Sequence, residues 1–396
     1  MGEQDLGAYG DIRTMKYEQS STQKRVLCFD QIRALMVALV IAIHVPVAFG
    51  GEWGWLGIRI PIEEPVSPLL KGFFGWYSYS INSFIMYMMF LIAGYFVPRS
   101  VHNKGVICYL RGRFVRLGIP FAAGLLLINN LSLLIARFSP NSPLAGMSLI
   151  DIPFNRIWVL WFLIVLLVFD LLYCAWVVLR GDRFSVDTSV PTPQIRSWVM
   201  SAFVLGVFQA VMASQTDLWT YLERSYFNGF GAQGMNIMTY TFLFFLGCKA
   251  SFHGWLERLD SHLVWAWFRL SLALLLGTLS LILTLTFSPN LVSDFTVLML
   301  FLRFLHPFIG WGIMAYLLMW FQRNENRVGQ GLAIAGVNSY GAYVIHSLVL
   351  VVVLMAISSL RINPWLVVLT ATLATTWISF KLAGQLRRIP AIARVL

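Results

Sequence analysis

Charge is scarce in this chain. Only 12% of its 396 residues are Asp, Glu, Lys or Arg, about half the fraction found in an ordinary soluble domain. Acidic residues are the scarcer sign, 18 against 29 basic ones. A disordered chain is rich in charge and poor in apolar residues, and a water-soluble enzyme needs a charged surface. The composition excludes both.

Cysteine is also rare. The four cysteines (Cys28, Cys108, Cys174 and Cys248) are widely spaced and form no CxxC pair. This spacing excludes a disulfide scaffold and shows no metal-ligand pattern, so we predict no metal site and interpret the cysteines as packing residues. Short alternating strands, the signature of an outer-membrane barrel, are missing as well.

Long apolar runs are abundant. Residues of the AVILMFWYC set make up 58% of the chain, and the mean hydropathy is +0.72. A spanning helix needs about 20 mostly apolar residues. The sequence therefore predicts an all-α, polytopic transmembrane bundle, with a polar segment at 1–24 and one membrane domain at 25–396. About ten spans are expected, at 32–50, 77–98, 117–137, 157–179, 197–215, 234–250, 264–287, 296–321, 333–358 and 365–383.

The basic residues predict the orientation. If the N-terminus is cytoplasmic, 22 of the 29 Lys and Arg residues fall on inside segments and six on outside segments, with Arg303 inside a helix. Cytoplasmic loops collect Lys and Arg, so both termini are expected in the cytoplasm. The same rule explains the net charge of +11, and we predict no nucleic-acid partner.

The first span carries three ionisable residues, Asp30, Arg33 and His44, in FDQIRALMVALVIAIH. Arg33 and His44 are eleven residues apart, about 20° beyond three full helical turns, so they share a face with a rise of about 16.5 Å between them. Arg33 is expected at the cytoplasmic boundary and His44 beyond mid-membrane. A histidine there can act as a general base. A hydrogen bond to a neighbouring helix would explain it equally well.

A basic cluster occupies the inside loop RSVHNKGVICYLRGRFVRLGIP. Arg113 and Arg116 are spaced i, i+3 and are expected to point the same way, with Arg111 nearby. Arginine forks suit phosphate oxygens. Taken alone, the cluster is better explained by the orientation rule and by contact with lipid headgroups.

Further polar residues lie inside later spans. Tyr343 and His346, in NSYGAYVIHSLVL, form an i, i+3 pair that could orient a substrate or simply make a hydrogen bond within the bundle. Asp170, and Arg303 with His306, are weaker candidates for a site.

Five segments, in this order, resemble the acyltransferase 3 family, whose members are integral membrane proteins that move acyl groups, often acetyl or succinyl, onto carbohydrates. The resemblance extends from about Arg25 to Leu382. The segments are RVLCFDQIRALMVALVIAIHVPVAF, MFLIAGYFVPRSVHNKGVICYLRGRFVRLGIP, WVLWFLIVLLVFDLLY, FLFFLGCKASFHGWLERL and SYGAYVIHSLVLV.

The resemblance implies residue roles. His44 corresponds to the essential histidine of the family motif, as general base or acyl carrier, and Arg33 to its arginine, with Asp30 grouped with them as a catalytic candidate. The arginine pair thought to meet the acyl donor corresponds to Arg113 and Arg116, with Arg111 added from the same loop. Tyr343 and His346 match a recurrent segment and are candidates for orienting the acceptor.

The resemblance also implies partners. Acyl-CoA, as acetyl-CoA or succinyl-CoA, would be a co-substrate, with no tightly bound cofactor, and the acceptor would be a carbohydrate at the cell surface or in the periplasm. The protein would be a multi-pass protein of the inner (plasma) membrane, in contact with the lipid bilayer. Its oligomeric state stays open.

Two other functions remain compatible with the sequence. One is an exporter or flippase of a glycan or small molecule without acyl chemistry, and the other is a membrane sensor or assembly protein without turnover. The shared face of Arg33 and His44, next to an arginine pair and without internal repeats, favours the acyltransferase.

Overall fold

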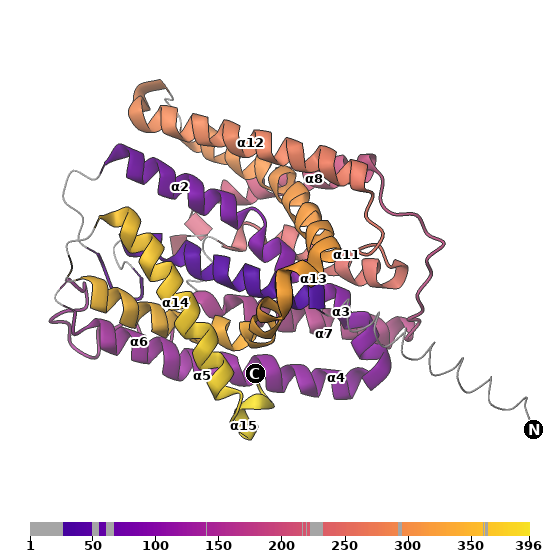
Figure 1. The fold of residues 1–396 in the computed structure, drawn as a ribbon, viewed down its shortest axis with the longest axis horizontal. Helices are drawn as coiled ribbons and strands as arrows, with labels where there is room; N and C mark the ends of the chain where they lie inside the picture. The colour runs from indigo at the N-terminus through magenta and orange to yellow at the C-terminus, as the bar shows by residue number, and fades with distance from the viewer. Residues whose placement is uncertain are drawn as a thin grey trace, which may run out of the picture.

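The computed structural model is a helical bundle (Figure 1). Its described residues form helices and no strand, as the sequence predicts. The polar segment 1–24 lies outside the described residues, so the prediction for it stays a prediction. The structure describes residues 27–49, 55–60, 67–139, 141–215, 217–218, 220–221, 233–291, 295–358, 360 and 363–396.

The helices follow one another with short connections. The first span, Leu27–Phe49, ends in the 3₁₀ turn η1 (Pro46–Phe49). The later elements are α2 (Pro68–Asn82), α3 (Ile85–Lys104), α4 (Val106–Arg113), the π-helical turn η2 (Phe114–Gly118), α5 (Ile119–Ala123), the π-helical turn η3 (Gly124–Ile128), α6 (Asn129–Ala136), η4 (Trp158–Leu160), α7 (Trp161–Arg180), α8 (Ile195–Ala213), α11 (Ile237–His253), α12 (Ser261–Phe287), η5 (Pro289–Leu291), α13 (Phe295–Ser358), α14 (Pro364–Leu386) and α15 (Pro390–Ala393).

Eight stretches of the described chain are long and apolar enough to cross a membrane. Every one of the ten predicted ranges falls on helix, but two of them share the 64-residue α13, and α11 has only 17 residues. Gly329 divides α13, because its φ of 81° is not helical. The number of spans and the side of each terminus stay predictions.

One predicted boundary is wrong. The first two predicted spans, 32–50 and 77–98, leave residues 51–76 between them as a loop, but α2 already begins at Pro68. Proline is well suited to the first position of a helix, since its missing N–H has no intrahelical partner there. Gly72 and Gly75 lower the helical signal of the segment. The first turns are nevertheless helical, and Leu70 and Gly72 are buried.

The helices lie side by side, with α2 and α12 along one edge and α4, α5 and α6 along the other (Figure 1). The tightest crossing joins α3 to α11. A Cβ on Gly94 would collide with the carbonyl of Phe244, and one on Gly247 with that of Leu91. Small residues allow this approach of two backbones, which is a common way to hold membrane helices together.

The first span runs parallel to the second part of α13. Near its start, the Gln31 amide donates to the carbonyls of Glu325 (3.0 Å) and Gly329 (3.3 Å), and so satisfies oxygens at the bend. The backbone of Gly336 lies against that of Asp30. At the other end, the ring of His44 contacts a ring from the same part of α13. The first span and the second part of α13 are therefore in contact at both ends.

Candidate functional site

Two histidines meet between the first span and α13. The rings of His44 and His346 are stacked, with centroids 5.4 Å apart and an interplanar angle of 22°. Trp55 covers both rings, with centroids 4.5 Å from His44 and 6.2 Å from His346. The Trp55 indole N–H donates to the carbonyl of Ser347 (3.3 Å), which fixes the tryptophan on α13. We call His44, His346, Trp55 and Ser347 the histidine cluster.

The histidine cluster has unused hydrogen-bonding atoms. The His346 Nδ1 donates to the carbonyl of Tyr343 one turn earlier, so its Nε2 is a proton acceptor. Within the described residues, this Nε2, the His44 Nδ1 and the Ser347 Oγ are buried without a hydrogen-bond partner. A buried polar atom left unpaired costs about 1–3 kcal/mol. The cluster is thus equipped to bind a polar group between the helices.

Tyr343 packs against the histidine cluster one turn before His346 on α13. Its ring centroid is 5.8 Å from that of His346. Its hydroxyl donates to the carbonyl of Val159 in η4. Because this bond already uses the hydroxyl proton, Tyr343 joins two helices and positions His346.

Arg33 lies about three turns before His44 on the first span. It forms an ion pair with Asp30 (2.9 Å) and lies over the ring of Phe96, 5.0 Å from its centroid. Asp30 therefore neutralises part of the charge of Arg33. The rise from Asp30 to His44 along the helix is about 21 Å, so Asp30 makes no contact with the histidine cluster.

Arg113 is held by two residues of the protein core. Its Nε lies 2.9 Å from an oxygen of Asp170 on α7 and 2.9 Å from the Tyr109 hydroxyl, which in turn donates to Asp170 (2.6 Å). Asp170 is fully buried. Arg33 and Arg113 are close enough to interact electrostatically. Two arginines from separate segments thus lie near each other, and only one edge of the Arg113 guanidinium is used.

Arg111 and Arg116 differ from Arg113. Both are exposed, and neither side chain has a hydrogen bond or ion pair within the described chain. Arg116 lies in the π-helical turn η2, whose wider winding changes the angle between positions 113 and 116. The i, i+3 spacing therefore does not place them in the same environment. The Tyr340 hydroxyl donates to the Arg116 carbonyl, and it interacts electrostatically with the side chains of Arg113 and Arg116.

Comparison with known proteins identifies the family. A family model described as an acyltransferase domain matches residues 26–384, which is nearly the whole chain. The chain belongs to the acyltransferase 3 family. No match was found among curated proteins, and none among solved structures. The protein is therefore a membrane acyltransferase.

The candidate site of this acyltransferase has two parts, one at each end of the first span. The histidine cluster is at one end. The other end holds Arg33 and Arg113, with Arg116 beside them through Tyr340, and we call these three residues the arginine group. Sequence reasoning did not find Tyr109 or Tyr340, and it considered Trp55 only as a sugar contact or part of an interfacial loop. A buried acid such as Asp170 in an apolar span signals a basic partner, but the sequence does not say which one.

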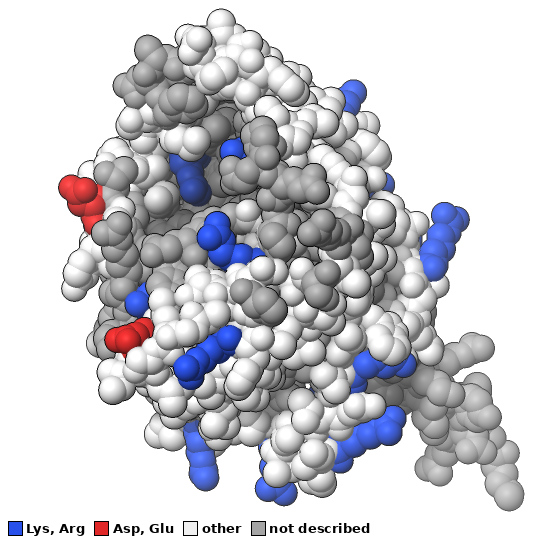
Figure 2. Space-filling model, turned by 90° about the vertical axis from the view of Figure 1, so that its left-hand side faces the viewer, with Lys and Arg blue, Asp and Glu red and all other residues white. Residues whose placement is uncertain are grey.

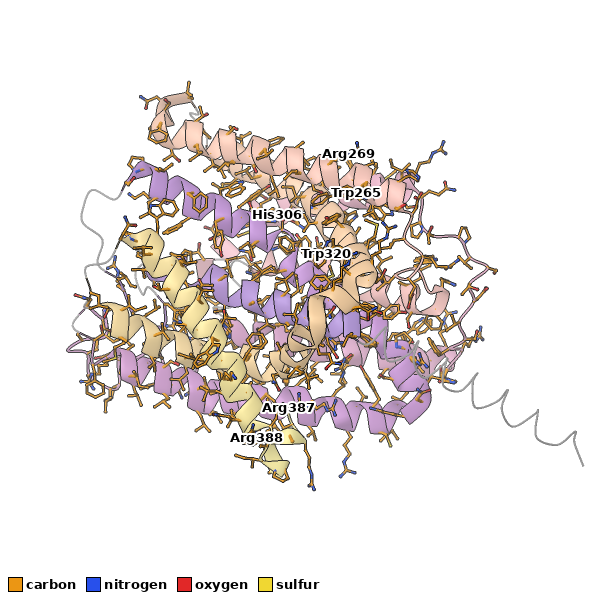
Figure 3. The ribbon with its side chains drawn as sticks, in the orientation of Figure 1. Trp265, Arg269, His306, Trp320, Arg387 and Arg388 are labelled. Atoms are coloured by element: carbon orange, nitrogen blue, oxygen red, sulfur yellow. The ribbon has the colours of Figure 1, made fainter. Side chains whose placement is uncertain are left out.

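Arg303 and His306 lie apart from both groups of residues. His306 projects from α13 toward α2 (Figure 3), where its ring centroid is 4.5 Å from that of Tyr79. Both His306 nitrogens are buried without a partner in the described structure.

Figure 2 views the end of the molecule at which α2 and α14 begin, and basic side chains lie in and around a hollow on that face.

Proposed function

We propose that this acyltransferase moves an acetyl or succinyl group from cytoplasmic acyl-CoA to a hydroxyl of a carbohydrate at the outer face of the inner membrane. The observation that carries the proposal is the pairing of His44 with His346, at one end of a helix whose other end carries Arg33. A base and a phosphate-binding group are thereby fixed on one rigid element.

The arginine group supplies the donor end. Acyl-CoA carries phosphates, which arginine binds through paired N–H donors. Arg116 is exposed, and Arg113 keeps one edge of its guanidinium free. The extended pantetheine arm of coenzyme A covers about the same length as the rise of roughly 16.5 Å from Arg33 to His44. With the phosphates at the arginine group, the thioester arrives at the histidine cluster.

At the histidine cluster, a neutral imidazole nitrogen of His44 accepts the proton of the acceptor hydroxyl. The hydroxyl oxygen attacks the thioester carbonyl, the new C–O bond forms, and the C–S bond breaks. The proton returns from His44 to the coenzyme A thiolate, so the products are an ester and free coenzyme A. Alternatively His44 takes the acyl group first and passes it to the hydroxyl. His346, through its free Nε2, orients the acceptor hydroxyl.

The decisive test compares His44→Ala with a matched variant, His306→Ala, in purified protein in nanodiscs. Each replaces an intramembrane histidine, but only His44 lies in the histidine cluster. Radiolabelled acetyl-CoA and succinyl-CoA are incubated with a surface-glycan extract, and label in the glycan is counted. We expect label from the wild type and His306→Ala and none from His44→Ala. Full activity of a folded His44→Ala contradicts the role of His44.

A protein that neither transfers label nor binds any acyl-CoA would contradict the proposed donor. Direct binding of acetyl-CoA and succinyl-CoA to the wild type, measured by calorimetry, separates this result from a wrong choice of acceptor. Absence of binding would favour the exporter.

A further inference from the structure

A cavity of about 190 Å³ lies where α3 and α11 finish. It is formed by the last turns of α3, the segment that follows α7, and the turn that follows α11. The orientation predicted from the basic residues places this end in the cytoplasm. The residues that matter for its chemistry are Tyr95, Phe96, Arg99, Phe184, Ser251 and Glu257.

The walls of the cavity are aromatic on two sides. Tyr95 and Phe96 pack edge to face on α3, with centroids 5.4 Å apart. Phe184, from the segment that follows α7, also lines the cavity and packs on Phe252, with ring centroids 5.1 Å apart. Phe96 also carries Arg33 on its ring. The cavity therefore adjoins the arginine group, with Phe96 shared between them.

The polar side chains around the cavity differ in how many hydrogen bonds they make within the protein. One oxygen of Glu257 accepts a hydrogen bond from the Tyr95 hydroxyl. The other, Oε2, is buried and has no partner within the described residues. Arg258 uses four of its five N–H donors, on backbone carbonyls at the end of α11 and in the segment that follows α7. Arg99 is exposed and has no hydrogen bond or ion pair within the described residues.

A flat heteroaromatic ring with an amino group satisfies these features together. Aromatic side chains pack against such rings, and a carboxylate oxygen accepts from an exocyclic amine. Arg99 and Arg33 lie where phosphates attached to the ring would need cations. A lipid headgroup would use the arginines but neither the aromatic walls nor the open acceptor of Glu257.

We propose that this cavity binds the adenine base of the acyl-CoA donor, with Glu257 Oε2 accepting a hydrogen bond from the 6-amino group. This inference rests on the proposed function, since it names the part of the donor that anchors it. The base in the cavity, the phosphates at Arg99 and the arginine group, and the thioester at His44 then form one continuous line along the first span.

The test changes the 6-substituent of the base in the ligand and the carboxylate of Glu257 in the protein. Binding of acetyl-CoA is compared with binding of its 6-oxo analogue, in which hypoxanthine replaces adenine, by calorimetry on the full-length protein in nanodiscs. The wild type should prefer the adenine form by about tenfold, because the 6-oxo group offers Glu257 a lone pair in place of a donor. In Glu257→Gln, the amide can donate to the 6-oxo group, and the preference should fall to about twofold or less.

Glu257→Gln preserves the fold, because a glutamine oxygen still accepts from Tyr95. Asp182→Asn is the matched control. It removes an exposed charge that pairs with His102. The asparagine oxygen can still accept from the backbone N–H of Phe184, so the variant should keep the wild-type preference. Phe184→Ala should weaken both ligands by a similar factor, because it removes packing against either base.

The outcomes separate this inference from the proposed function. If acetyl-CoA binds to the wild type but both base forms bind equally, or if Glu257→Gln keeps the full preference, the adenine site is wrong and the donor proposal stands. If acetyl-CoA does not bind to the wild type at all, the donor proposal fails and the adenine site fails with it.

Discussion

At the residue scale, the burial of Asp170 beside the partly buried Arg113 is the most consequential feature. A guanidinium inside a membrane protein is tolerated only with partners, and Asp170 and Tyr109 supply them. Removing one member of a buried pair is costly, because the other charge is left uncompensated. The pair therefore holds α4 against α7 and presents the remaining edge of Arg113.

Asp170→Ala should lower the stability by about 1–3 kcal/mol, because the partly exposed Arg113 loses its counterion and the buried Tyr109 hydroxyl loses its acceptor. Asp182→Ala, which breaks the exposed pair with His102, should cost at most about 1 kcal/mol. Thermal unfolding of both variants in detergent measures the difference. Equal melting temperatures would show that the buried pair contributes nothing to the fold.

Arg116→Ala should raise the KM for acyl-CoA about tenfold with little change in stability, because the exposed side chain supports no other group in the described structure. Arg269→Ala is the matched control, since this arginine is exposed on α12 (Figure 3), at the opposite edge of the bundle from α4 (Figure 1). Initial rates at varied donor concentration decide the point. An unchanged donor KM in Arg116→Ala would remove Arg116 from the donor site.

At the scale of elements, two glycines decide how α3 meets α11. Backbones that touch at Gly94 and Gly247 leave no space for a methyl group. An added methyl group in a packed interface forces the helices apart. The same substitution on an open helix surface is favourable, because alanine is the better helix former.

Gly94→Ala should therefore destabilise the protein by about 1–3 kcal/mol. Gly277→Ala, on α12, has nothing within 4 Å of the new methyl group and should be neutral or raise stability by up to about 1 kcal/mol. The melting temperature should fall in Gly94→Ala and stay the same or rise in Gly277→Ala. A stable Gly94→Ala variant would mean that α3 and α11 do not cross this closely.

At the scale of the whole molecule, the sequence predicts the helical class and most of the helices, because a spanning helix must be apolar along its whole length. It misses the start of α2, where proline and glycine weaken the signal. It places Arg33 and His44 on one face but does not pair His44 with His346, since a contact between residues about 300 positions apart leaves no trace in periodicity. The roles of these residues stay predictions.

The orientation can be tested with a native cysteine. Cys108 is exposed near the start of α4, whereas Cys28, Cys174 and Cys248 are buried. A membrane-impermeant maleimide should leave Cys108 unlabelled in intact cells and label it after permeabilisation, because the basic residues place this end in the cytoplasm. In Cys108→Ser with Ser148→Cys, labelling should occur in intact cells. Labelling of Cys108 from outside would invert the topology.

The joining of the first span to α13 at both ends has a consequence for donor selection. Gln31 fixes the span at the bend of α13, and His44 fixes it at His346, so the distance between Arg33 and His44 is a constant of the fold. On the proposed function, the helix acts as a ruler of about 16.5 Å. A donor with a shortened arm would bind its phosphates and still fail to deliver its thioester. The fixed distance therefore selects donors by the length of their arm. The acyl group itself would be selected by the few residues around His44.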